Sequence, residues 1–200
     1  IVSDLHLGND YFHYRAFMSW LDQMPTGAVL VLNGDIIDDP KKPLRSEHAK
    51  VLERIVSESY GRKVIWIYGN HDTHMNLEDT GEIFFAEEWS LGDSLLIMHG
   101  HKLDDIMPRH ALFKWIFRRF HHICKAFGLN NMHVAQYAKR WGYLYRILNE
   151  RVAQNGIAVA RKKGFNAIAC GHTHFAMNTH NIDTQYFNSG AWTEVPLHYI

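Results

Sequence analysis

Short apolar runs that end in a polar turn recur along the chain. The segment 28–33 (AVLVLN) leads into Gly34-Asp35, and the segment 63–68 (KVIWIY) leads into Gly69-Asn70. Near-continuous apolar runs of this length are typical of strands buried on both faces of a sheet. We therefore expect strands at five positions, residues 28–33, 63–68, 94–98, 167–170 and 184–188, and the end of a further strand at residues 1–3.

Helical spacing of apolar residues lies between the first of these strands, at residues 10–24 and 45–60. The first half of the chain is thus predicted to be a βαβαβ series. Residues 108–163 show helical spacing and no strand signal, so we expect two or three helices inserted there. With 200 residues the chain fits one domain of the α/β class, residues 1–200, carrying a helical insertion at about 108–163.

Polar side chains that bind metals follow the predicted strands. Open α/β sheets gather their ligand sites at the carboxyl ends of strands. Asp4 and His6 are two residues apart, as are His172 and His174, so on a strand end each pair would project from one face. The candidate ligands are Asp4, His6, Asp35, Asn70, His99, His172 and His174.

The chemistry of this set favours two metal ions. Oxygen and nitrogen donors without sulfur suit Mn²⁺ best, with Fe and Zn²⁺ as alternatives. Seven ligands are too many for one tetrahedral ion, but they suit two ions about 3.5–4 Å apart that share a carboxylate. Such a pair clamps the oxygens of a phosphate and lowers the pKa of a bridging water, which gives hydroxide near neutral pH.

Five motifs along the chain resemble, in order, those of the calcineurin-like metallophosphoesterases. One such motif alone is a weak signal, whereas five in order between residues 4 and 174 are a strong one. The resemblance implies an αββα sandwich, in which two packed mixed β-sheets are flanked by helices. The motifs are Asp4-x-His6, Gly34-Asp35-x-x-Asp38, Gly69-Asn70-His71-Asp72, His99-Gly100-His101 and Gly171-His172-Thr173-His174.

The resemblance also implies a role for each position. The first metal ion would be held by Asp4, His6, Asp35 and His174. Asp35 would bridge to a second ion held by Asn70, His99 and His172. His71 would lie outside the metal shell and stabilise or protonate the leaving oxygen, and Asp72 would orient the His71 ring. Whether Asp38 and His101 contact the site is left open.

The predicted insertion carries an unusual charge. From Arg109 to Arg151 nine residues are Lys or Arg and one, Glu150, is acidic, although the formal charge of the whole chain is zero. Aromatic residues such as Trp115 and Phe117 lie between the cations. Three interpretations stay open: ordinary helices with solvated cations, a lid that binds a phosphorylated substrate, or a helix on an anionic membrane surface. The candidate substrate-binding residues are Arg109, Lys114, Arg118 and Arg119.

Motif order, length and the basic insertion are similar to those of UDP-2,3-diacylglucosamine diphosphatases of lipid A synthesis. That resemblance implies a pyrophosphatase acting on a nucleotide-linked lipid at the inner face of the cytoplasmic membrane. Two positions depart from it, because that group has Arg at the place of His71 and Asp at the place of His101. The alternatives are a phosphomonoesterase or phosphodiesterase for a phosphoprotein or cyclic nucleotide, and a non-catalytic binding scaffold.

Net charge, cysteine content and hydropathy limit the partners and the cellular location that we expect for the protein. A chain without net charge has no general field for nucleic acid, so we do not expect a nucleic-acid partner. Cys124 and Cys170 form neither a disulfide framework nor a thiolate metal site, which suits a reducing cytoplasm. No apolar run reaches the roughly 18 residues of a membrane span. We expect a cytoplasmic protein that contacts a membrane only peripherally, and the sequence does not indicate its oligomeric state.

Overall fold

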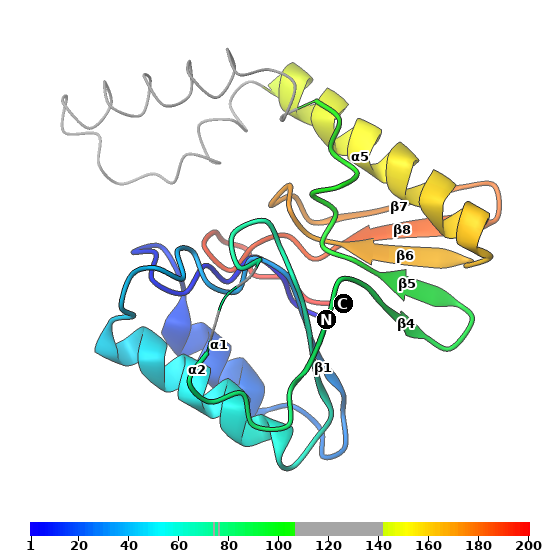
Figure 1. Ribbon diagram of the computed structural model, residues 1–200. Helices are drawn as coiled ribbons and strands as arrows, with labels where there is room; N and C mark the ends of the chain where they lie inside the picture. The colour runs from blue at the N-terminus through cyan, green and yellow to red at the C-terminus, as the bar shows by residue number, and fades with distance from the viewer. Residues whose placement is uncertain (74, 76, 107–141) are drawn as a thin grey trace, which may run out of the picture.

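The computed structural model describes residues 1–73, 75, 77–106 and 142–200, and within them two β-sheets pack between helices (Figure 1). The elements are α1 (Tyr14–Asp22), β1 (Leu30–Asn33), α2 (Ser46–Ser59), β2 (Val64–Ile67), β3 (Phe84–Ala86), β4 (Trp89–Leu91), β5 (Leu95–Ile97), α5 (Gly142–Lys163), β6 (Ala167–Cys170), β7 (Met177–Asn181) and β8 (Thr184–Asn188).

The two sheets divide the strands by their place in the sequence. The first sheet has the order β1-β2-β3, and both of its pairings are parallel. Val2 forms an isolated parallel bridge to Leu32, so the first residues of the chain lie along the free side of β1. The second sheet has the order β4-β5-β6-β8-β7 and is mixed, with a parallel centre of β5, β6 and β8 between antiparallel edges. The predicted α/β class and the two-sheet sandwich are confirmed.

Side chains of the central strands point alternately to the two faces of their sheet, and this alternation fills the apolar layers of the core. In β2, Val64 and Trp66 face the helices, whereas Ile65 and Ile67 face the second sheet. Successive side chains of a strand point to opposite faces, so a strand with apolar residues at every position fills the spaces on both sides of its sheet. Three clusters of buried apolar residues result: one under α1 and α2, one between the sheets and one under α5.

The helices cover the outer faces of the sandwich. In Figure 1, α1 and α2 lie on the outside of the first sheet and α5 lies across the second. Helix α5 buries Val152, Ile157 and Ala160 in the cluster that contains Ile168 and Tyr186. Within the predicted insertion, Gly142–Lys163 form the helix α5, and residues 108–141 lie outside the described residues.

Gly34 follows β1 at a place where the two sheets approach each other. Its φ is +82°, and a Cβ atom there would lie 2.4 Å from the ring of His99. A side chain therefore meets two obstacles at this position, the left-handed backbone and the imidazole ring.

We predict that Gly34→Ala lowers the free energy of unfolding of the metal-free protein by about 2–5 kcal/mol, from backbone strain and overpacking together. Gly164→Ala is the matched control, because Gly164 has φ +84° and no atom within 4 Å of the added Cβ. The control should lose only the strain, about 1–2 kcal/mol. Urea denaturation followed by circular dichroism measures both, and equal losses would contradict the role of the His99 contact.

Candidate metal centre

The predicted ligands occupy strained backbone positions. Six described non-glycine residues have positive φ, and five of them are predicted ligands with φ between 52° and 68°: Asp4, His6, Asp35, His172 and His174. The left-handed conformation costs roughly 1–2 kcal/mol for a residue with a side chain, and such strain is concentrated at functional sites. We predicted that Asp4 and His6 share one face of a strand end, and that prediction is wrong, because neither residue has the extended backbone of a strand. They reach the site from a twisted segment that follows Val2.

A first group consists of Asp4, His6 and His174, each of which offers one ligand atom within 4.8 Å of the others. His174 Nε2 lies 3.3 Å from Asp4 Oδ1 and 3.2 Å from His6 Nε2. Two imidazole nitrogens and a carboxylate oxygen thus converge on one place, although His174 lies 168 residues after His6 in the sequence. This is the donor set predicted for the first metal, except that Asp35 belongs to the neighbouring group.

A second group consists of Asp35, His99 and His172, again with one ligand atom each within 4.8 Å. His99 Nε2 lies 3.3 Å from Asp35 Oδ2. Asn70 is exposed, and the residue after it, His71, donates its backbone N–H to Asp35 Oδ1 at 2.8 Å. Asn70 therefore neighbours this group through the chain, and its role as a ligand stays a prediction.

The outward-facing nitrogen of each of the four histidines faces an oxygen acceptor. Carbonyl and carboxylate oxygens accept but do not donate, so the three nitrogens that lie within 3.1 Å of such an oxygen, on His6, His99 and His172, carry their proton on the outer side of the ring. The lone pair of the other nitrogen then points into the group, as in metal-binding histidines. The pairs are His6 Nδ1 with Asp38 Oδ1 (3.0 Å), His99 Nδ1 with Asn33 O (2.8 Å), His172 Nε2 with Asp104 Oδ2 (3.1 Å) and, at a longer distance, His174 Nδ1 with Glu194 Oε1 (3.7 Å).

Two buried atoms that face into the groups indicate whether the groups can hold a cation. Asp4 Oδ1 and His99 Nε2 are buried and, within the described part of the chain, have no partner in hydrogen-bond geometry. Buried polar atoms are normally satisfied, because leaving one unpaired costs free energy. A carboxylate oxygen and an imidazole nitrogen are both ligands of divalent metals, so the two groups fit the metal ions expected from the sequence.

Charge compensation within the groups shifts the pKa values of their members. Burial alone would lower the pKa of His99, but the carboxylates of Asp35 and Asp4 outweigh it and raise that pKa to about 9. Burial is likewise outweighed at His174, where Asp4 raises the pKa to about 9. Burial also opposes ionisation of Asp35, yet the neighbouring histidines, His99 first, hold its pKa below the ordinary value. Positive charge is thus strongly favoured beside these carboxylates, and a metal ion would take the place of the protons.

His71 lies at the open edge of the centre. Its side chain is 41 % exposed, and its Nε2 is 4.0 Å from Asp35 Oδ2. Its Nδ1 is 2.7 Å from the carbonyl oxygen of Asp38, so Nδ1 carries a proton and donates it there. The Nε2 atom is the one left to face a substrate.

Asp72 does not orient the His71 ring, and that prediction is wrong. Its fully buried carboxylate accepts hydrogen bonds from the backbone N–H of Gly69 (2.7 Å), the backbone N–H of Ile36 (2.8 Å) and the indole N–H of Trp66 (3.3 Å). Backbone donors at two strand ends thus occupy its oxygens. Asp72 joins the ends of β1 and β2, while the Asp38 carbonyl takes the place predicted for it beside His71.

Four further residues complete the surroundings of the two groups. Asp38, whose role the motifs left open, forms a third cluster of potential ligands with His6 and His71. Asp104 and Glu194 were not predicted, since neither lies in a motif, and only their contacts to His172 and His174 reveal them. His101 is half-buried 5.5 Å from the His99 ring, and burial, aided by His99 and His172, lowers its pKa to about 4. The candidate substrate-binding residues Arg109, Lys114, Arg118 and Arg119 lie outside the described residues.

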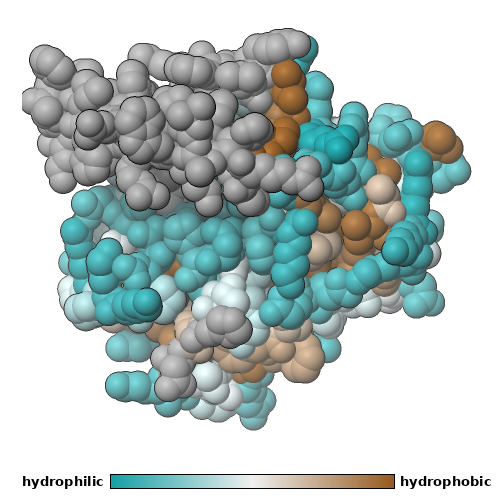
Figure 2. Space-filling model, turned by 45° about the horizontal axis from the view of Figure 1, so that its top comes forward, coloured by the Kyte–Doolittle hydropathy of each residue, from teal (hydrophilic) through white to brown (hydrophobic). Residues whose placement is uncertain are grey.

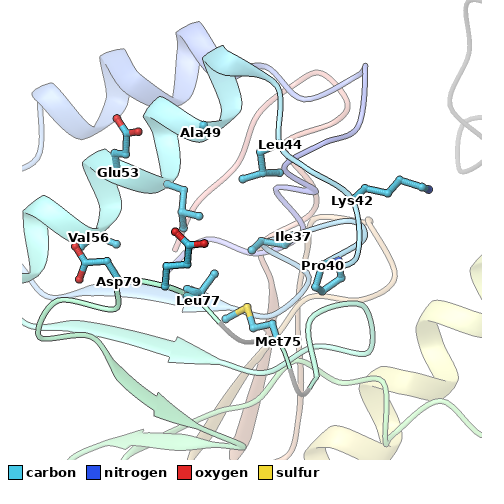
Figure 3. A pocket seen from close by; sticks show the side chains of 12 residues that line it. Ile37, Pro40, Lys42, Leu44, Ala49, Glu53, Val56, Met75, Leu77 and Asp79 are labelled. Atoms are coloured by element: carbon cyan, nitrogen blue, oxygen red, sulfur yellow. The ribbon is translucent and has the colours of Figure 1, made fainter.

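A groove of about 400 Å³ lies elsewhere, between α2 and the segments around Pro40 and Leu77 (Figure 3). Its floor is apolar, with Ile37, Leu44 and Val56 among the lining residues. None of the seven predicted metal ligands lines it. The chemistry therefore belongs to the two groups at the strand ends and not to this groove.

The chain resembles solved structures of a Vps29 double mutant from Entamoeba histolytica (TM-score 0.50, 11 % identity, 96 % of this chain and 72 % of that one) and of the phosphoesterase YfcE from E. coli (TM-score 0.46, 19 % identity, 96 % and 78 %). At these identities the likeness concerns the fold alone. No curated protein matches the sequence. The family model for calcineurin-like phosphoesterases matches residues 1–176, which include all five motifs, and the chain belongs to that family.

Proposed function

We propose that the chain is a dinuclear metal-dependent phosphoesterase whose metal ions are held by the two groups at the strand ends. The observation that carries the proposal is the convergence of three donor atoms within 4.8 Å in each group, on residues most of which have positive φ. Family membership supports the class of reaction, the metal-dependent hydrolysis of a phosphate ester. In the proposal, Asp35 bridges a first site of Asp4, His6 and His174 and a second site of Asn70, His99 and His172.

The protein would supply binding and proton transfer around those ions. When bound, two divalent ions polarise a phosphoryl group and lower the pKa of the attacking water. His71 would interact with the leaving oxygen through Nε2, because its Nδ1 is held by the Asp38 carbonyl. Hydrogen bonding at Nδ1 fixes the direction of the ring and therefore the direction in which Nε2 can give a proton.

A non-catalytic scaffold is the alternative outside the enzyme class. A scaffold has no need of metal ligands, and loss of several of them would support it. This chain keeps all seven, and the structure brings six of them into two compact groups. The enzyme is therefore the better proposal.

For the substrate we propose an amphiphilic phosphoanhydride, such as a nucleotide-linked lipid of the UDP-2,3-diacylglucosamine kind. The support is sequence-based: nine cations with interleaved aromatics stand between the fourth and fifth motifs. No helix of the described residues is long and apolar enough to cross a membrane. Most of the described surface shown in Figure 2 is hydrophilic, with separate hydrophobic areas between. A soluble phosphomonoester or phosphodiester is the second candidate, because His71 stands where the lipid enzymes have Arg.

Asp35→Ala tests the bridging role. After reconstitution with Mn²⁺, the wild type should hold about two ions per chain and the variant should hold neither. The variant should therefore lose essentially all hydrolysis of bis-nitrophenyl phosphate. Asp39→Ala, which removes a carboxylate four residues away that pairs with Lys42, should keep both metal and activity. Elemental analysis after desalting measures the metal. An Asp35→Ala protein with wild-type metal content would contradict the proposal, as would a fully active wild type with fewer than about two ions.

His71→Ala tests proton donation to the leaving group. The kcat should fall by about 10²–10⁴ for an ester with a poor leaving group, with unchanged metal content. For nitrophenyl phosphates, whose leaving group needs no proton, the loss should be much smaller. His180→Ala, which removes an exposed histidine of β7, is the control and should behave as the wild type. A loss of equal size for all leaving groups would show that His71 acts in binding instead.

Replacing Arg118 and Arg119 by Ala tests the amphiphilic substrate. Each cation lost from a phosphate contact weakens binding, so KM for a lipid-linked pyrophosphate should rise about 10–100-fold and binding to anionic vesicles should weaken. Hydrolysis of bis-nitrophenyl phosphate should stay unchanged, because that ester needs only the metal centre. Replacing Lys50 and Lys162, two exposed cations, by Ala serves as the charge-matched control. If both activities fall in parallel, the segment supports the core and the lipid proposal is wrong.

A further inference from the structure

His172 is the most exposed histidine of the two groups. Its side chain is 19 % exposed, compared with 1 % for His99, 4 % for His6 and 12 % for His174. Its backbone is strained, with φ +68°, and its N–H donates to Asp4 Oδ2 at 3.0 Å. These contacts fix the main chain, and they leave the direction of the ring to be set by the contacts of the ring itself.

Asp104 makes such a contact. Its Oδ2 lies 3.1 Å from His172 Nε2, and its side chain is 1 % exposed. Its other oxygen, Oδ1, accepts the backbone N–H of Ile106 at 2.9 Å, so the carboxylate is held in place. Because a carboxylate only accepts, His172 carries its proton on Nε2, which leaves Nδ1 as its ligand atom in the group with Asp35 and His99. His6, His99 and His174 differ, since their outer acceptors face Nδ1 and they present Nε2.

The segment that carries Asp104 is anchored to α5. Asn155 donates its side-chain N–H to the carbonyl oxygen of Leu103 at 2.8 Å, and Arg151 pairs with Asp105 at 3.1 Å. Leu103 is buried in the same apolar cluster as α5. Asp104 therefore projects from a fixed piece of backbone toward His172.

We propose that Asp104 is a positioning residue for the second metal ion, which selects Nδ1 of His172 as the ligand atom and holds the ring in its binding direction. This proposal rests on the proposed two-metal function. Asp104 touches neither substrate nor metal in it. An acceptor behind a ligating imidazole raises the basicity of the ring and removes its rotational freedom, and its loss costs about 10–100-fold in metal affinity.

The test is a Mn²⁺ titration of the metal-free full chain, followed by the electron paramagnetic resonance signal of free Mn²⁺. In Asp104→Ala the Kd of one site should rise about 10–100-fold, while the other site stays within about twofold of the wild type. Asp104→Asn should show a smaller loss, because the amide oxygen still accepts from Nε2 but carries no charge. The kcat of both variants should recover at saturating Mn²⁺, as expected of a residue that positions a ligand.

Asp105→Asn is the matched control. It alters the neighbouring carboxylate and its ion pair with Arg151 on the same segment, without contact to His172. Its metal affinities should match those of the wild type, and a loss equal to that of Asp104→Ala would overturn the proposal. Thermal unfolding of the metal-free proteins shows whether Asp104→Ala folds; if it does not, Asp104→Asn decides, and unchanged affinity in it overturns the proposal. A wild type that binds no Mn²⁺ would instead refute the proposed function.

Discussion

Two buried carboxylates, Asp4 and Asp35, lie at neighbouring strand ends, and the rest of the site is arranged around their charge. Burial raises the free energy of a carboxylate unless positive charge or donors compensate it. His99 and His174 provide that compensation in the metal-free protein, and their raised pKa values are the result. A centre of this kind attracts cations because its negative charge exceeds what hydrogen bonds alone can balance. The same charge explains why four histidines collect at one edge of the fold.

Bringing these groups together requires the two sheets to approach closely at their carboxyl ends. The His99 ring, from the second sheet, donates to the carbonyl of Asn33 in the first. A Cβ atom at Gly171 would lie 2.4 Å from Asp4 Oδ2, so the turn after β6 passes directly over the carboxylate of the other sheet. The positive φ values of the ligands follow from this crowding, since regular strands would carry the side chains past one another. The three apolar clusters around the sheets stabilise the fold and so offset the free-energy cost of this backbone strain.

The sequence predicts those parts of the fold that are buried on both sides. The strands β1, β2, β5 and β6 show continuous apolar runs, and each is followed by a motif that carries predicted ligands. The three strands that the pattern missed, β3, β4 and β7, lie at sheet edges. β7 has the sequence MNTHN and is largely exposed, so it has no apolar signal to detect. Contacts between segments that are distant in the sequence could not be predicted from the pattern either. Asp72 accepts the backbone N–H of Ile36, and Asp104 and Glu194 reach the histidines of the fifth motif, which no local spacing encodes.

The predicted metal ligands and His71, the residue predicted to act on the leaving group, differ in their exposure. The histidine and aspartate ligands of the two groups are buried or nearly so, whereas His71 is 41 % exposed although its ring lies 4.9 Å from that of His6. A residue that only supported the metals would gain from burial, because a dry surrounding strengthens its electrostatic interactions. His71 remains accessible, held at Nδ1 and free at Nε2, as is needed for a group that acts on a molecule arriving from solvent. In the proposed function, the buried groups would supply the reaction chemistry, and the surface that His71 faces would take part in the choice of substrate.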